Sequence, residues 1–169
     1  FDLPAEEGNV QIKEGISYLS LVERHRGTGS VTNGFVSGFG YTGSMAIASS
    51  VAHDSHHMIV VGTDRKLMAA AANRLGEVGG GVTLWKDDAE RALVELPIAG
   101  LMSDSQAAEV ANKAQAIISA MIDCGCSLNN AYMQHTLLAL VVIPELRISD
   151  LGLVDVNHFE LTEVISPKS

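Results

Sequence analysis

Residues 45–62 have the sequence MAIASSVAHDSHHMIVVG. Apolar residues lead up to His53 and resume after His57, so both flanks are expected to be buried strands with a polar bend between them. Three of the six histidines of the chain and one aspartate lie within this bend. Junctions between buried segments are common places for binding and catalytic groups, so the bend is the first candidate site.

Length and composition indicate one domain over residues 1–169, because 47% apolar and 18% charged residues suffice for one compact core. The formal charge of -9 and the eleven scattered Lys and Arg residues argue against nucleic acid or an anionic membrane as a partner. No apolar run approaches the roughly 20 residues needed to span a bilayer, and the acidic first residues are unlike a signal peptide. A cytoplasmic protein is therefore expected.

The cysteines and two isolated histidines are expected to serve packing rather than chemistry. Cys124 and Cys126 lie too close in the sequence for a disulfide between them to stabilise the fold, and two cysteines cannot complete a four-thiolate zinc site. We expect both thiols to be reduced. His135 and His158 stand alone among apolar neighbours, which is typical of histidines satisfied in a core or at its edge.

The pattern of the whole chain predicts an α/β domain of the α+β type, with a mixed, largely antiparallel sheet packed with two or three helices. Further strands are expected over residues 16–24, 34–40, 81–86, 91–96 and 153–164. A first helix should follow a Thr63 cap and end at Gly79, and a second should follow a capping box at 103–106 and end at Gly125. Residues 131–143 should start as a helix and end extended, and residues 144–152 should be a connector.

Residues 38–43 match the G-x-G-x-x-G pattern of dinucleotide-binding sites, and Asp64 follows at a suitable distance. A dinucleotide site needs a full helix after the third glycine. Only residues 44–52 are available for that helix, and they are rich in serine and small residues. Glycines that serve turns and close strand packing are the better interpretation of this pattern.

The bend itself allows three interpretations. His53 and His56 have a spacing that suits metal ligands, with Asp54 or His57 as a third donor. Imidazoles beside a carboxylate can also act as acid and base near neutral pH. The third interpretation is a polar turn whose histidines are satisfied by backbone groups.

Glu23 and His25 follow the strand expected over residues 16–24. If that strand lies beside the bend, these two side chains would join the histidine cluster.

Several longer motifs together resemble the C-terminal domain of bacterial adenine deaminase, a member of the amidohydrolase superfamily. They are ERHRGTG at 23–29, GFVSGFG at 34–40, AIASSVAHDSH at 46–56, PIAGLMSD at 97–104 and IPELRISDLGLVD at 143–155. The similarity extends from about Lys13 to Val156. The chain departs from the family pattern at His57, where an amide residue is more usual, and over residues 129–135, which are more polar.

The resemblance implies an enzyme that converts adenine to hypoxanthine and ammonia with hydroxide activated by a divalent metal such as manganese, iron or zinc. It places that metal on a (β/α)₈ barrel domain that precedes this one. The barrel is absent here, because the chain contains no His-x-His pair and 169 residues fall short of the roughly 250 of such a barrel. The implied partners are the barrel domain, adenine and further copies in a homo-oligomer.

The leading hypothesis is that this domain packs on or closes the barrel site through Glu23, His25, His53 and Asp54, and that it is inactive alone. A metal held by His53, His56 and His57 is a further expectation. The alternatives are a structural or oligomerisation module and a small metal-binding or nucleotide-binding domain.

Overall fold

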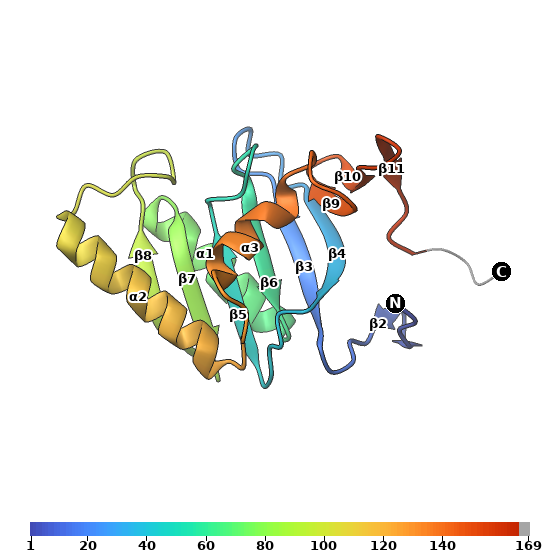
Figure 1. The fold of residues 1–169 in the computed structure, drawn as a ribbon, viewed down its shortest axis with the longest axis horizontal. Helices are drawn as coiled ribbons and strands as arrows, with labels where there is room; N and C mark the ends of the chain where they lie inside the picture. Colours follow the sequence, from blue (N-terminus) through green and yellow to red (C-terminus); the bar gives the residue numbers. More distant parts are fainter. Residues whose placement is uncertain (166–169) are drawn as a thin grey trace.

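The computed structural model describes residues 1–165, so residues 166–169 of the expected domain lie outside the described part. Its centre is a six-stranded sheet with the order β4-β3-β6-β5-β7-β8, in which every pairing is antiparallel (Figure 1). The α+β class is confirmed, and the sheet expected to be mixed has no parallel pair among these strands. The strands are β3 (Ile16–Val22), β4 (Val31–Ser37), β5 (Met45–Ser49), β6 (Met58–Gly62), β7 (Gly81–Lys86) and β8 (Ala89–Glu95).

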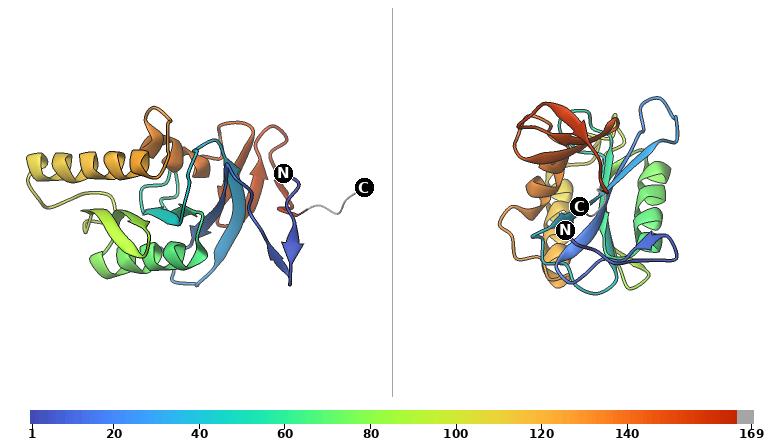
Figure 2. Two further views of the ribbon diagram at one scale, coloured as in Figure 1. Left: turned by 90° about the horizontal axis from the view of Figure 1, so that it is seen from below. Right: turned by 90° about the vertical axis from the view of Figure 1, so that its right-hand side faces the viewer.

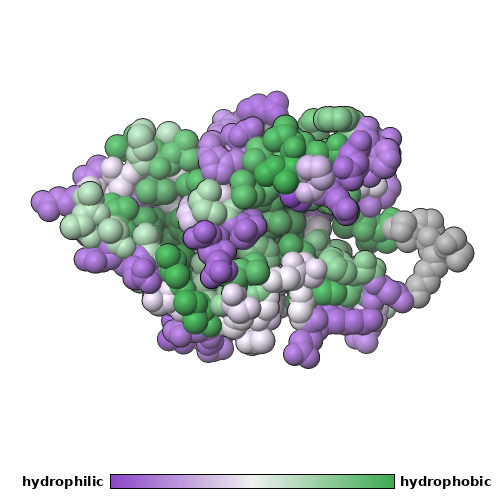
Figure 3. All heavy atoms as spheres, viewed as in Figure 1, coloured by the Kyte–Doolittle hydropathy of each residue, from purple (hydrophilic) through white to green (hydrophobic). Residues whose placement is uncertain are grey.

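Helices cover both faces of this sheet. Helix α1 (Arg65–Val78) packs on one face, and α2 (Ala107–Asp123) and α3 (Ala131–Thr136) lie on the other, followed by the 3₁₀ turn η1 (Leu137–Ala139) (Figure 2). Strands β5 and β6 are buried at every position because they lie centrally under both layers, which explains their continuous apolar runs. The face that carries α2 and α3 shows apolar surface between polar groups (Figure 3).

The ends of the helices differ in part from the expected caps. Asp64, rather than Thr63, caps α1, because its Oδ1 accepts hydrogen bonds from the backbone N–H groups of Lys66 and Leu67. Gly79 ends α1 in the left-handed conformation, as expected. The capping box at 103–106 does not form, since α2 begins after Gln106 without a side-chain cap bond.

The hairpin between β7 and β8 turns at Asp87 and Asp88 alone, so the strand expected to start at residue 91 begins at Ala89. Both aspartates have positive φ, 51° and 60°, which is typical of a tight turn that matches the strand twist.

The last part of the chain folds as a separate three-stranded sheet, so the connector expected over 144–152 and the single strand expected over 153–164 are wrong. The strands are β9 (Leu146–Ser149), β10 (Gly152–Asp155) and β11 (Glu160–Thr162). Turns around Asp150 and Phe159 break the apolar pattern into short pieces. Ile148 is fully buried in the main core and anchors this sheet.

The extended end expected before Pro144 is also wrong, because η1 and turns occupy residues 137–143. A short hairpin of β1 (Ala5–Glu6) and β2 (Asn9–Val10) precedes the main sheet. Across residues 1–165, no helix has the length and apolar character that crossing a bilayer requires.

Candidate functional site

The histidine bend and the loop that follows β3 leave the same end of the sheet. Strand β3 pairs with β6 so that Val22 lies opposite Met58, which brings residues 23–30 beside residues 50–57 (Figure 1). The hypothesis that Glu23 and His25 join the histidine cluster is therefore confirmed. Loop residues 97–102 and the turn between β9 and β10 complete this end, because Arg24 binds the Ala99 carbonyl oxygen and His57 lies beside Asp150.

Glu23 organises its own loop and is buried. Its carboxylate accepts hydrogen bonds from the backbone N–H groups of His25 (2.6 Å), Arg26 (2.7 Å) and Thr28 (3.0 Å), and from the Thr28 hydroxyl (3.0 Å). These donors, the Thr28 backbone N–H foremost, lower the pKa of Glu23 to about 2. Both carboxylate oxygens are thus engaged within the loop, so Glu23 holds the loop that carries His25.

Arg24 ties neighbouring loops together. Its Nε donates to the carbonyl oxygen of His56 at 2.6 Å, and its Nη2 donates to the carbonyl oxygen of Ala99 at 2.9 Å. Burial lowers the pKa of this guanidinium. Arg24 therefore fixes the histidine bend and the 97–102 loop relative to the end of β3.

His57 is the buried centre of the cluster. Its Nδ1 accepts the backbone N–H of Arg24 at 3.4 Å, and its ring centroid lies 4.7 Å from that of His25. Its Nε2 lies 3.6 Å from Oδ2 of Asp150, and Arg26 lies 3.7 Å from the same oxygen. The turn between β9 and β10 is thereby linked to the bend through Asp150, which no sequence pattern had singled out.

The remaining histidines of the site differ in how they are held. His56 binds the backbone of its own bend, whereas His25 and His53 lie at the outer edge of the site. His56 Nδ1 accepts the backbone N–H of Ala52 at 3.2 Å, and burial is the largest cause that lowers its pKa. His25 Nε2 donates to the carbonyl oxygen of Ser55 at 2.6 Å, although the ring is exposed. Within residues 1–165, neither the half-buried His53 ring nor the exposed Asp54 carboxylate makes a hydrogen bond.

The histidines do not converge as a metal site. The His53 and His56 ring centroids are 5.1 Å apart, whereas His57 turns toward Asp150. Among residues 1–165 there is no group of three or more His, Cys, Asp or Glu side chains that could hold a metal ion. The expected set of His53, His56 and His57 is therefore not assembled in this structure.

Ser50 is a supporting residue that the sequence patterns did not indicate. Its side chain is fully buried, its Oγ accepts the Gly81 N–H at 2.7 Å, and it donates to the Gly100 carbonyl oxygen at 2.6 Å. One hydroxyl thus joins the end of β5 to the start of β7 and to the 97–102 loop. A single serine in a Ser-rich run carries no local signal for such contacts.

Replacing Ser50 with alanine should lower the free energy of unfolding by about 1–3 kcal/mol, because two buried backbone groups lose this partner. Chemical denaturation followed by circular dichroism measures the change. Ser119→Ala on the exposed surface of α2 is the matched control and should be nearly neutral. Equal stability of the two variants would contradict the bridging role.

The residues expected to be structural are either buried in the core or bonded at the exposed edge of the fold. Cys124 and Cys126 are buried free thiols, as expected. His135 is fully enclosed, with Nε2 2.7 Å from the Tyr41 hydroxyl, and burial lowers its pKa to about 3. His158 lies at the exposed edge, 2.9 Å from Asp155.

The glycines at 38–43 serve turns. They are followed by strand β5 and not by the helix that a dinucleotide site requires.

Comparison with known proteins identifies the family. A sequence model described as "Adenine deaminase C-terminal domain" matches residues 1–160. Relatives named adenine deaminase include those of Ruegeria pomeroyi (70% identical over 98% of this chain), Roseobacter denitrificans (73% over 98%) and Moorella thermoacetica (42% over 97%). The chain spans about 28% of the length of each of these relatives. This chain therefore belongs to the adenine deaminase C-terminal domain family.

Proposed function

We propose that this chain is the C-terminal domain of an adenine deaminase, a cytoplasmic hydrolase that converts adenine to hypoxanthine and ammonia. The family match over residues 1–160 and the names of the relatives support this activity. In this proposal a separate barrel domain supplies hydroxide activated by manganese, iron or zinc, and the present domain alone is inactive. No residue of this chain is assigned to the metal.

The role proposed for this domain is to pack against the barrel and close its substrate site with the histidine edge. We use this name for His25, His53 and Asp54. The observation that carries the proposal is that the residues of the cluster differ in their contacts. The side chains of Glu23 and Arg24 bind the loops, whereas the histidine edge reaches the surface. Polar groups held on a fixed frame can exclude water and meet a substrate with little loss of conformational entropy.

The test is to replace His53 with alanine in the full-length enzyme. We expect kcat/KM for adenine to fall about 10- to 100-fold, because the closing edge loses a polar contact and admits water. Thermal stability and metal content should stay at the wild-type values, since the His53 side chain makes no hydrogen bond within residues 1–165. Asp54→Asn tests the second polar group of the edge in the same assay.

His158→Ala is the matched control, because His158 is exposed and lies in the turn between β10 and β11. It should leave kcat/KM unchanged. A His53→Ala enzyme with wild-type kcat/KM and metal content would reject the closing role.

A structural or oligomerisation module is the second candidate function. It is favoured by one observation: His25, His56 and His57 each already have a partner within the loops. The His53→Ala assay separates the two candidates, because a fall in kcat/KM at unchanged thermal stability favours the closing role and an unchanged kcat/KM favours a scaffold. Sedimentation of the full-length enzyme reports on the proposed homo-oligomer.

A further inference from the structure

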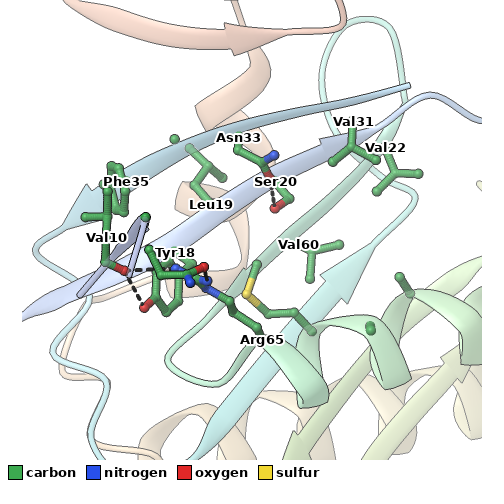
Figure 4. A pocket seen from close by; sticks show the side chains of 16 residues that line it. Val10, Tyr18, Leu19, Ser20, Val22, Val31, Asn33, Phe35, Val60 and Arg65 are labelled. Atoms are coloured by element: carbon green, nitrogen blue, oxygen red, sulfur yellow. Dashed lines mark hydrogen bonds between the residues drawn. The ribbon is translucent and has the colours of Figure 1, made fainter. Parts of the chain in front are cut away.

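A groove of about 520 Å³ lies on the α1 side of strands β3 and β4 (Figure 4). Its floor consists of side chains that face the same way on the paired strands, since Tyr18 lies opposite Phe35, Ser20 opposite Asn33 and Val22 opposite Val31. Helix α1 contributes one wall and the β1–β2 hairpin closes one end. The groove is distinct from the loops of the candidate site, although it ends next to them.

Most of the polar side chains in this groove already have partners. Ser20 donates to Oδ1 of Asn33 at 2.7 Å. Arg65 lies 4.5 Å from the Tyr18 ring centroid and donates to the Val10 carbonyl oxygen at 2.8 Å, an oxygen that also accepts the Tyr18 hydroxyl at 3.1 Å. The surface that the groove leaves free for a ligand or partner is therefore mainly apolar. Such a surface suits a polypeptide better than a charged metabolite, which would need free polar groups to orient it.

The position of the groove indicates which polypeptide would fill it. At one end lies the hairpin through which the chain enters the domain, and at the other lie Val22 and Val31, which flank the Glu23 loop (Figure 4). The relatives are more than three times as long as this chain, which covers 28% of them, and the matched family is a C-terminal domain. The remaining polypeptide therefore reaches this domain at the hairpin end of the groove.

We propose that the polypeptide preceding this domain in the full-length protein packs into the groove formed by β3, β4, α1 and the β1–β2 hairpin. This inference rests on the proposed function, because it presumes the longer enzyme, and it names the surface by which that enzyme holds the domain. A polypeptide that fills the groove contacts Val22 and Val31, and it therefore lies next to the loop that carries His25. The groove thus positions the histidine edge against the preceding domain.

The test uses cysteine labelling of the full-length protein. Val31→Cys and Asn33→Cys place a thiol on the groove, and Val142→Cys is the matched control, since Val31 and Val142 are 47% and 65% exposed in this domain. Each labelling rate with a maleimide, followed by peptide mass spectrometry, is divided by the rate of the same thiol in the urea-unfolded protein. Cys124 and Cys126 are buried, and fragment-ion spectra distinguish their labelling from that of the thiol introduced at position 142, which lies on the same tryptic peptide.

We expect both groove cysteines to react at least about 10-fold more slowly than the control, because the preceding polypeptide covers them. Reaction of both at the control rate would overturn the proposal. Protection that vanishes on dilution would identify a second copy as the occupant, and protection that requires added adenine would identify a small ligand. Either result also overturns it.

Failure of the groove proposal can be told apart from failure of the proposed function. Unprotected groove cysteines in an enzyme that loses activity on His53→Ala would reject only the docking surface. Protected groove cysteines in an enzyme unaffected by His53→Ala would reject only the closing role.

Discussion

Replacing Gly81 with alanine is expected to abolish stable folding of this domain. Gly81 starts β7 with a φ of 142°, and a Cβ added there would overlap the carbonyl oxygen of Val94 on the paired strand β8. Neither backbone can move away without breaking the β7–β8 ladder at the point where Ser50 also binds Gly81. Steric overlap with backbone and an unfavourable φ together should cost more than about 4 kcal/mol. Soluble yield and thermal unfolding followed by circular dichroism measure the loss.

Gly76→Ala is the matched control for the same substitution. Gly76 lies within α1 and is exposed, and a Cβ added there meets nothing within 4 Å. Alanine should stabilise the helix by about 0.5–1 kcal/mol, because glycine is a poor residue for a helix interior. A Gly81→Ala protein that unfolds at the wild-type Tm would show that the close approach of β7 and β8 is not required.

The second large effect is expected from Glu23→Gln. The amide keeps one acceptor oxygen but turns an NH₂ group toward backbone N–H groups that now bind a carboxylate, so the loop over residues 23–30 loses its organising bonds. At pH 7 the Tm should fall by about 5 °C. The same change should lower deamination by the full-length enzyme, because His25 belongs to this loop.

The pH dependence of that effect follows from the pKa of Glu23, which is lowered from the ordinary value of 4.5 to about 2 in the folded chain. A depressed pKa means that the folded state favours the ionised carboxylate, so its stabilisation is complete above pH 4.5 and is lost as pH falls toward 2. The Tm difference between the wild type and Glu23→Gln should therefore shrink over that window. Glu14→Gln, at an exposed position, is the control. A difference that stays constant from pH 7 to pH 2 would show that the carboxylate charge is not responsible.

The expected elements that proved right share a local cause. The runs that flank the histidine bend are apolar at every position, and the strands they form lie between two helical layers. The apolar positions of α1 repeat at helical spacing and end at a glycine that adopts the left-handed conformation. The strands of the three-stranded sheet were missed because each has only three or four residues, too few for alternation to separate them from loops.

The candidate site was predictable in part for the same reason. His53, Asp54, His56 and His57 are adjacent in the sequence, so their grouping needed no knowledge of the fold. Which of these side chains would be held by the loops and which would stay exposed was not predictable. That difference depends on backbone N–H and carbonyl groups of other loops, and the spacing of residues in the sequence does not indicate such contacts.

Neighbouring residues alone were enough to predict two buried strands around a polar bend, and helices with one apolar face beside them, because burial and helical period are local properties. The folded chain was needed to show that the Glu23 carboxylate binds its own loop, that His57 lies beside Asp150 and that Ser50 links three segments. These contacts join residues far apart in the chain. They depend on strand order, register and side-chain direction, which are fixed only when the whole sheet forms.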